Sequence, residues 1–187
     1  MKLTTRQLTV CGLLAALSTV IMFLEFNLPF IPPFLKLDFS DVPALIGAVL
    51  ISPAAGVLTI VIKNMVHLLM TSTGGAGEFA NMTMGCCYIL PISLTYGKGA
   101  AKTALGVALS IILMTLAAMI TNYFVLLPWY SKVMPLDTVI EMCAGVNPLI
   151  KSKADIVIYG VAPFNIAKGV INTAFCAALL RYLPKKI

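Results

Sequence analysis

Three polar side chains interrupt an apolar stretch near the C-terminal end of the chain. Asn165, Lys168 and Asn172 are three and four residues apart, so in a helix they share one face. A lysine halfway along an apolar span costs several kcal/mol unless it is hydrated, paired or bound to a ligand. The spacing therefore favours a polar pocket, which Asn122 and Tyr123 of the preceding apolar stretch could complete. The alternatives are a lysine that extends to the membrane interface and structural hydrogen bonds between helices.

A second polar group lies in an earlier apolar stretch. His67, the only histidine, follows Lys63 by four residues and Asn64 by three, so these side chains lie close together on a helix. A proton relay is one reading, but a packing role is more frequent for a histidine without a second histidine or a carboxylate in its own stretch. Asn81, shortly after Glu78, could face the same pocket or simply begin a helix.

Motifs for other functions are missing from the sequence. There is no Gly-x-Ser-x-Gly, no His-Glu-x-x-His and no Walker A loop, which disfavours an enzyme and means that any ATP hydrolysis for transport comes from a partner. The five cysteines show no metal spacing, and four of them (Cys11, Cys86, Cys87 and Cys176) lie in apolar stretches, where a thiol behaves as a small hydrophobe. The net charge of +6 does not come from a basic run with interleaved aromatics, so nucleic acid is excluded as a partner.

The composition requires that membrane lipid be the main solvent of this chain. Of its 187 residues, 60% are apolar and only 11% are charged, and its mean hydropathy is +0.99. Soluble proteins carry about 25% charged residues. A helical span needs roughly 20 apolar residues, so there is room for about six spans and no separate soluble domain. We expect one integral membrane domain over residues 1–187.

The apolar stretches predict an all-α bundle of six transmembrane helices. The first covers residues 8–28, which is longer than the h-region of a signal peptide. The block 42–70 is interrupted at Ser52 and Pro53, and we read it as a tight hairpin of two short spans. A Gly-rich turn separates it from a fourth span over 79–96. The fifth span, 103–127, is stopped by Pro128, and the sixth covers 156–183.

The basic residues predict that both termini are cytoplasmic. Six spans would place seven of the 13 lysines and arginines inside, in agreement with the positive-inside pattern: Lys2, Arg6, Lys98, Lys102, Arg181, Lys185 and Lys186. All seven acidic residues would then lie at or near the outer side. The two long outer loops, 29–40 and 128–155, are of a length typical of lids or binding loops.

Small residues line the first predicted span in two pairs of spacing four. Gly12 and Ala16 form one pair, and Ala15 and Thr19 form the other. Such pairs allow another helix to approach closely, either within the bundle or in a partner protein.

Taken together, these residues and motifs resemble the substrate-binding S components of energy-coupling-factor vitamin transporters. The resemblance spans nearly the whole chain and is clearest in residues 12–19, in 34–47, and in 63–69 with the Gly-rich turn, Glu78 and Asn81 that follow. The element Leu37-Asp38-Phe39-Ser40, with Pro43 and Gly47 after it, resembles the riboflavin-specific branch.

The resemblance implies a six-helix fold in a prokaryotic cell membrane that binds one riboflavin at its outer side, under the loop that follows the first span. The residues that match the binding site are Leu37, Phe39, Ser40, Asn81, Asn122, Glu141, Asn165 and Lys168. It also implies that Gly12, Ala15, Ala16 and Thr19 dock on a transmembrane coupling subunit, which sits on two ATPases. The family's Ala-x-x-x-Ala is Gly12-x-x-x-Ala16 in this chain. Riboflavin is then the transported ligand, with no catalytic residue, metal or cofactor, and ATP is used by the partners to reset an S component that topples in the membrane.

Two other classes of function remain open at this point. One is a stand-alone secondary carrier in which Lys63 and His67, or Lys168 and Glu141, couple protons to a small organic substrate. The other is a small membrane enzyme or assembly factor.

Overall fold

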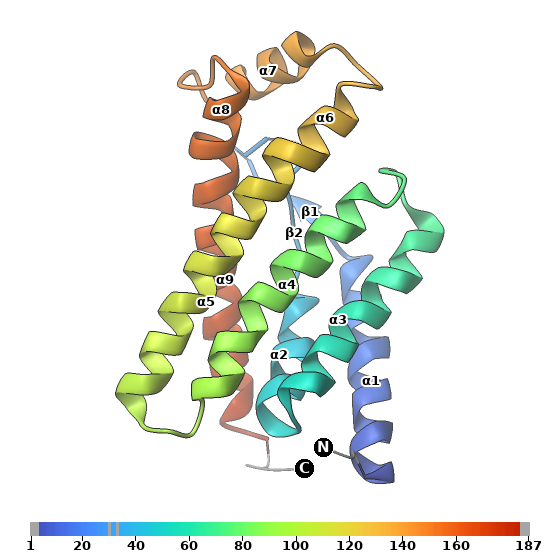
Figure 1. Ribbon diagram of the computed structural model, residues 1–187, viewed down its shortest axis with the longest axis vertical. Helices are drawn as coiled ribbons and strands as arrows, with labels where there is room; N and C mark the ends of the chain where they lie inside the picture. The colour runs from blue at the N-terminus through green and yellow to red at the C-terminus, as the bar shows by residue number, and fades with distance from the viewer. Residues whose placement is uncertain (1–3, 30, 33, 184–187) are drawn as a thin grey trace.

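A computed structural model describes residues 4–29, 31–32 and 34–183 of the chain. Long helices run roughly along one axis, and α1 begins at the same end of the bundle where α9 ends (Figure 1). The helices are α1 (Thr5–Met22), α2 (Asp41–Leu50), α3 (Pro53–His67), α4 (Ala76–Thr95), α5 (Ala100–Thr121), α6 (Leu127–Tyr130), α7 (Leu136–Ala144), α8 (Lys153–Asp155) and α9 (Ala162–Leu180). A short 3-10 turn, Leu68–Met70, follows α3.

The first helix ends earlier than the sequence predicts. Thr4 caps α1 by accepting a hydrogen bond from the backbone N–H of Gln7, but the helix stops at Met22 and not near residue 28. The chain then forms an antiparallel pair of two-residue strands, β1 (Phe26–Asn27) and β2 (Lys36–Leu37). Leu28 precedes Pro29, and a residue in that position is disfavoured in the α region, so the helix cannot readily resume there. The all-α prediction is therefore wrong for this hairpin.

The predicted break at Ser52 and Pro53 is confirmed. The Ser52 hydroxyl accepts a hydrogen bond from the backbone N–H of Ala55, and Pro53 occupies the first turn of α3, where its missing N–H costs nothing. The packing of α2 on α3 is close, since a Cβ at Gly56 would lie 2.4 Å from the Cβ of Ala48. Almost every residue of α2 is buried, so this ten-residue helix lies in the interior of the bundle.

Both of the later long helices contain a π-helical segment, a wider turn than the α-helix. Residues Asn122–Leu126 are π-helical between α5 and α6, and residues Ile156–Val161 are π-helical between α8 and α9. The prediction that Pro128 stops the fifth span is wrong, because the helix continues through it to Tyr130. The wider turn before Pro128 accommodates the ring and the missing N–H of the proline.

The long loop predicted over residues 128–155 contains an unpredicted helix, α7. Buried apolar side chains of α7 and of the neighbouring helices form a small core of their own at this end of the molecule: Leu127, Val139, Cys143, Ile150, Ile156 and Val157. The loop is thereby an ordered cap on the ends of α6 and α8, which Figure 1 shows beneath α7.

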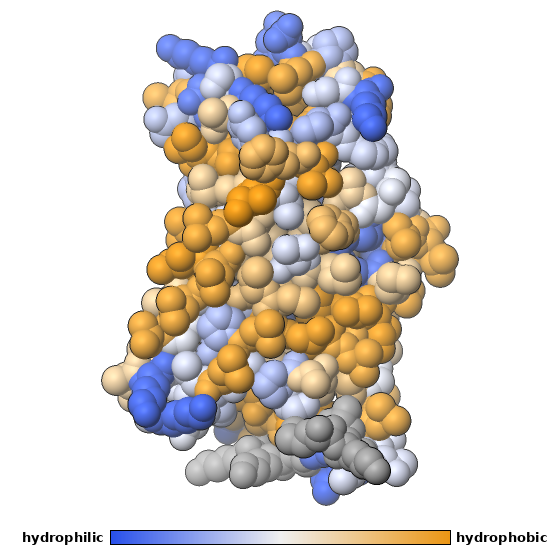
Figure 2. All heavy atoms as spheres, in the orientation of Figure 1, coloured by the Kyte–Doolittle hydropathy of each residue, from blue (hydrophilic) through white to orange (hydrophobic). Residues whose placement is uncertain are grey.

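The outer surface of the bundle is predominantly apolar between two more polar ends (Figure 2). In the described part of the chain, four helical segments are long and apolar enough to cross a membrane: Thr5–Met22, Pro53–Met70, Ala100–Tyr130 and Lys153–Leu180. The helix α2 is shorter, and α4, although 20 residues long, carries Glu78 and Asn81 in its first turns. These four helices indicate an integral membrane protein. They correspond to four of the six predicted spans, judged by length and composition.

Candidate ligand-binding cavity

Two lysines within the helices are neutralised by acids that follow the β1–β2 hairpin. Lys63 of α3 is fully buried, and its Nζ donates to Asp41 Oδ1 at 2.6 Å and to Ser40 Oγ at 2.6 Å. Lys168 of α9 donates to Asp38 Oδ2 at 2.8 Å. Since a buried charge without a partner is very unfavourable, this cluster fixes the segment 38–41 against both helices.

Asp38 also receives hydrogen bonds from Ser40, through its backbone N–H at 2.8 Å and through its hydroxyl. Burial by itself would raise the pKa of this carboxyl, but the charges of Lys168 and Lys63 hold the pKa well below its usual range. Asp38 therefore stays ionised at neutral pH and keeps Lys168 in place.

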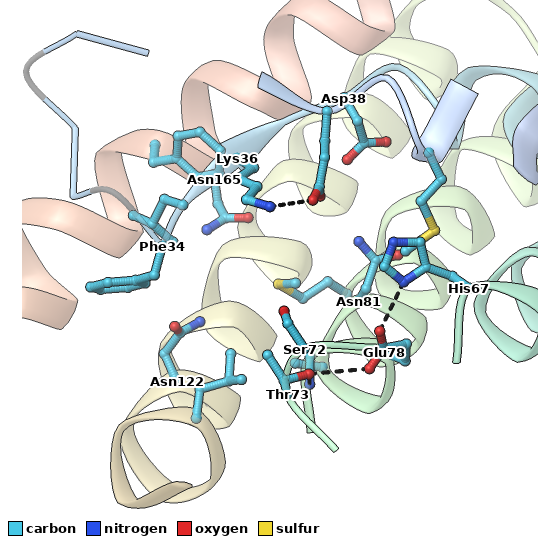
Figure 3. A pocket seen from close by; sticks show the side chains of 18 of the residues that line it. Phe34, Lys36, Asp38, His67, Ser72, Thr73, Glu78, Asn81, Asn122 and Asn165 are labelled. Atoms are coloured by element: carbon cyan, nitrogen blue, oxygen red, sulfur yellow. Dashed lines mark hydrogen bonds and ion pairs between the residues drawn. The ribbon is translucent and has the colours of Figure 1, made fainter. Parts of the chain in front are cut away.

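A cavity of about 310 Å³ opens beside this cluster, beneath the hairpin (Figure 3). Its volume lies at the lower end of the range of small-molecule sites. Its apolar walls come from the hairpin loop, α1, α4, α6 and α9, and include Phe34 and Tyr130, whose ring centroids are 5.6 Å apart. The polar side chains on its walls are Glu25, Lys36, Asp38, His67, Ser72, Thr73, Glu78, Asn81, Asn122, Asn165 and Lys168.

Four of the eight residues that the sequence places in a binding site line this cavity: Asn81, Asn122, Asn165 and Lys168. The side-chain N–H groups of Asn122 and Asn165 donate to the carbonyls of Ala118 (2.8 Å) and Val161 (2.9 Å), which fixes the orientation of both amides. The buried Oδ1 atoms of Asn81 and Asn122 have no partner among the described residues. An N–H or O–H donor on a bound molecule would satisfy them.

The two amides are placed by the irregular turns of their helices. Asn122 is the first residue of the π-helical segment after α5, and Asn165 bonds to Val161, the last residue of the other π-helical segment. Such segments occur often at functional sites because the wider turn redirects side chains.

The other four predicted residues lie outside the cavity wall. Leu37 is buried in an apolar cluster with Phe164, and Phe39 packs on Phe175 with 5.3 Å between ring centroids. Ser40 is fully buried in the ion-pair cluster. These three side chains pack or bond next to residues of the wall without lining the cavity themselves. Glu141 is exposed on α7 and lies apart from the others.

A sequence model of the family described as "ECF transporter, substrate-specific component" matches residues 6–180 of the chain. The chain belongs to this family of S components. It is a transport component and not an enzyme.

Relatives and a solved structure agree with this assignment. The S component is 33% identical over 180 residues to "Riboflavin transporter RibU" of Staphylococcus aureus strain TCH60. The aligned residues cover 95% of this chain and 90% of the relative. This chain is also 33% identical over 177 residues to "Riboflavin transporter FmnP" of Bacillus subtilis strain 168, with 90% and 86% covered. A structure titled as the S component of a bacterial ECF transporter superposes with a TM-score of 0.76 at 31% identity, and the match covers 95% of this chain and 94% of that chain.

Sequence reasoning missed several residues of the cavity in this S component. Asp38 belongs to the motif at residues 37–40, but only the structure shows its bond to Lys168 at the cavity. Only the structure likewise shows that His67 and Glu78 are partners, with 2.8 Å between Nδ1 and Oε1. Lys63 and His67, read as one group, have separate partners, since Lys63 pairs with Asp41. The spacing of polar residues within one helix reveals neither pairing, because each partner belongs to another element.

The two small-residue pairs of α1 have different surroundings in the S component. Gly12 and Ala16 are exposed on the surface of the bundle, and a Cβ at Gly12 would meet no atom of the described residues within 4 Å. Ala15 and Thr19 face inward and are buried, and the Thr19 hydroxyl bonds to the carbonyl of Ala15 at 2.8 Å. Only the first pair is available to another protein.

Proposed function

We propose that this S component binds riboflavin in the cavity beneath the hairpin and mediates its uptake together with an ECF energising module. The observation that carries the proposal is the composition of the cavity wall. Fixed amides and Lys168 line the same cavity as the aromatic rings of Phe34, Tyr130 and Phe164. A flat heteroaromatic ring with carbonyl and imide groups along one edge would require such a mixture. The relatives named above, both called riboflavin transporters, support this choice of ligand.

We assign the polar recognition to the four predicted residues that line the cavity. In this assignment the Oδ1 atoms of Asn81 and Asn122 accept hydrogen bonds from the ligand, and Lys168 donates to a carbonyl oxygen. Leu37, Phe39 and Ser40 hold the segment 37–40 in position and affect the ligand only indirectly, by positioning residues of the cavity wall. Glu141 is not included, because it lies on the exposed face of α7.

We further propose a single membrane domain of six spans with both ends in the cytoplasm of a prokaryotic cell. The six helical rods would be α1, α2, α3, α4, the continuous α5–α6 and the continuous α8–α9. In Figure 1 the beginning of α1, the α4–α5 turn and the end of α9 lie at one end of the bundle. The basic residues Arg6, Lys98, Lys102 and Arg181 belong to these three segments, which supports the positive-inside orientation. Lys2, Lys185 and Lys186 lie outside the described residues.

The partners in this proposal are a transmembrane coupling subunit and a pair of ATPases. Their docking surface on the S component would be the exposed face of α1 around Gly12 and Ala16, where another helix can approach closely. A stand-alone carrier is disfavoured by membership of a family of substrate-specific components.

A fluorescence titration tests the ligand. Riboflavin is added to the purified protein in detergent, quenching of flavin fluorescence is followed, and thiamin and biotin serve as competitors. We expect saturable quenching that neither competitor reverses. Absence of quenching by a protein that is shown to be folded would refute riboflavin as the ligand.

A pair of matched variants tests the cavity. Asn165→Leu removes a buried amide from the cavity wall, whereas Asn172→Leu makes the same change two turns further along α9, outside the wall. A lost buried hydrogen bond is worth about 1 to 3 kcal/mol, so we expect riboflavin binding to weaken roughly 5- to 150-fold in the first variant. Equal affinities in both variants would refute the assignment of the cavity.

A further inference from the structure

A second polar cluster forms the wall of the cavity opposite Asn122 and Asn165 (Figure 3). Its centre is Glu78, in the first turn of α4, which is almost completely buried. Glu78 Oε1 lies 2.8 Å from Nδ1 of His67, and Oε2 accepts hydrogen bonds from the hydroxyls of Thr71 (2.9 Å) and Thr73 (3.2 Å). The ring of His67 is in turn stacked on Phe23. These contacts hold the carboxylate in one position at the cavity.

In the described part of the chain, Glu78 has no lysine or arginine partner; its ion-pair partner is His67, whose ring is a cation only when protonated. The two other acids on the described cavity wall each have a lysine partner: Glu25 bonds to Lys36, and Asp38 bonds to Lys168. Neither of these lysines is an ion-pair partner of Glu78. An anionic group placed beside Glu78 would therefore meet its negative charge without a lysine or arginine of the described wall between them.

The backbone N–H groups near this end of α4 do not offer an anion site either. The N–H of Gly75 donates to the Thr71 hydroxyl at 3.2 Å, and the N–H of Gly77 donates to the Thr73 hydroxyl at 2.9 Å. The positive end of the helix dipole faces the carboxylate of Glu78 itself. A helix N-terminus can bind phosphate, but the side chains of this chain already occupy this one.

The cluster lies at the outer mouth of the cavity, since the neighbouring residues Ser72 and Gly74 are exposed. In the proposed function, the carbonyl and imide edge of the flavin lies at Asn122, Asn165 and Lys168. The flexible polyol tail of the flavin then extends toward Glu78. A hydroxyl at the end of that tail would donate to the carboxylate, whereas a phosphate with a charge of about −1.5 to −2 would face a like charge.

We infer that Glu78, positioned by His67, Thr71 and Thr73, is a specificity-determining residue that selects flavins with a free terminal hydroxyl over flavins phosphorylated at that position. This inference rests on the proposed function. Like charges brought together in a partly desolvated site oppose binding, so we expect the unmodified protein to bind riboflavin at least about tenfold more tightly than flavin mononucleotide.

The test is the ratio of the Kd values for flavin mononucleotide and riboflavin, measured by fluorescence quenching in the unmodified protein and in Glu78→Gln. The substitution keeps the size of the side chain and one oxygen acceptor but removes the charge. We expect the ratio to fall about tenfold or more, mainly through tighter binding of the phosphorylated flavin. Asp137→Asn, which removes an exposed acid of α7 outside the cavity, is the control and should leave the ratio unchanged. An unchanged ratio in a folded Glu78→Gln variant would overturn the inference.

A ligand series on the unmodified protein tests the same point even if that variant does not fold. Riboflavin 5′-acetate is neutral but extends the tail as the phosphate does. If charge decides the selection, the acetate binds much more tightly than flavin mononucleotide. Equally weak binding of both esters would show that size decides and would overturn the role of Glu78. Absence of riboflavin binding would instead refute the proposed function itself.

Discussion

The ion pair between Lys63 and Asp41 provides the sharpest test of how the bundle is held together. The Lys63 side chain is 0% exposed and that of Asp41 is 4% exposed, with 2.6 Å between Nζ and Oδ1. If Lys63 is replaced by methionine, the nearest remaining cation to Asp41 is Lys168, at 3.9 Å from Oδ2. Lys168 already bonds to Asp38, so Asp41 is left buried without a direct partner.

The magnitude follows from the burial of both groups. Removing one partner of a buried ion pair costs about 3 to 5 kcal/mol, because the other charge remains without compensation. For a chain of this length, 1 kcal/mol shifts the midpoint of thermal unfolding by about 2 to 4 °C. We therefore expect Lys63→Met to lower Tm by about 6 to 20 °C.

The double variant Lys63→Met with Asp41→Asn separates the charge from the packing. It removes both members of the pair and keeps the shape of the acid, so at least half of the lost stability should return. Ser40 still donates its hydroxyl to Asp38 in this variant, which leaves the hairpin segment attached to Lys168.

Buried thiols supply the assay. Cys11, Cys143 and Cys176 are free and buried, so a thiol-reactive fluorescent dye reports their exposure when the detergent-solubilised protein unfolds. A shift of less than about 3 °C for Lys63→Met, or a double variant as unstable as the sum of both single variants, would refute the reasoning.

Four other substitutions have distinct expected outcomes. Lys168→Leu should lower Tm as well as riboflavin affinity, because it leaves Asp38 buried without its cation; a loss of affinity with unchanged thermal unfolding would contradict this. Gly12→Leu should leave riboflavin binding intact and abolish uptake by cells that contain the energising module, since a Cβ at this position would meet no atom of the described residues within 4 Å; equal loss of binding and uptake would indicate an internal packing role. Gly56→Ala should destabilise the protein by about 1 to 3 kcal/mol in a thermal scan, because the new Cβ would press α3 away from α2, and an unchanged Tm would count against that close contact. Asn172→Leu should not lower Tm, because neither side-chain amide atom of this buried residue has a partner in the described part of the chain; a drop of several degrees would reveal an interaction that the packing does not show.

The sequence was a reliable guide wherever a single helix decides the outcome. The break at Ser52 and Pro53 depends on a local cap and on the geometry of proline, and both act within a few residues. The face shared by Asn165 and Lys168 depends only on helical spacing, and both side chains line the cavity. Asn122 and Asn81 were found for the same reason, as polar residues in apolar helices.

The errors arose where the backbone departs from regular geometry or where tertiary contacts decide. Pro128 was expected to end the helix, because the spacing of residues does not reveal the π-helical turn that precedes it and accommodates it. The first helix was predicted too long because apolar residues continue into the hairpin, whose strands pair across the loop. Glu141 lies on the exposed face of α7, away from the cavity wall, so its assignment to the site stays a prediction.

Composition and spacing by themselves determined that this chain is a helical membrane protein with polar residues gathered in its later helices, because lipid tolerates few charges and helical geometry fixes which side chains are neighbours. Only the tertiary structure decided which charges meet. Asp38 reaches Lys168 across 130 residues, and Glu78 reaches His67 from a different helix. Pairing energies depend on distances of a few ångströms between separate elements, and the packing of the whole bundle sets those distances.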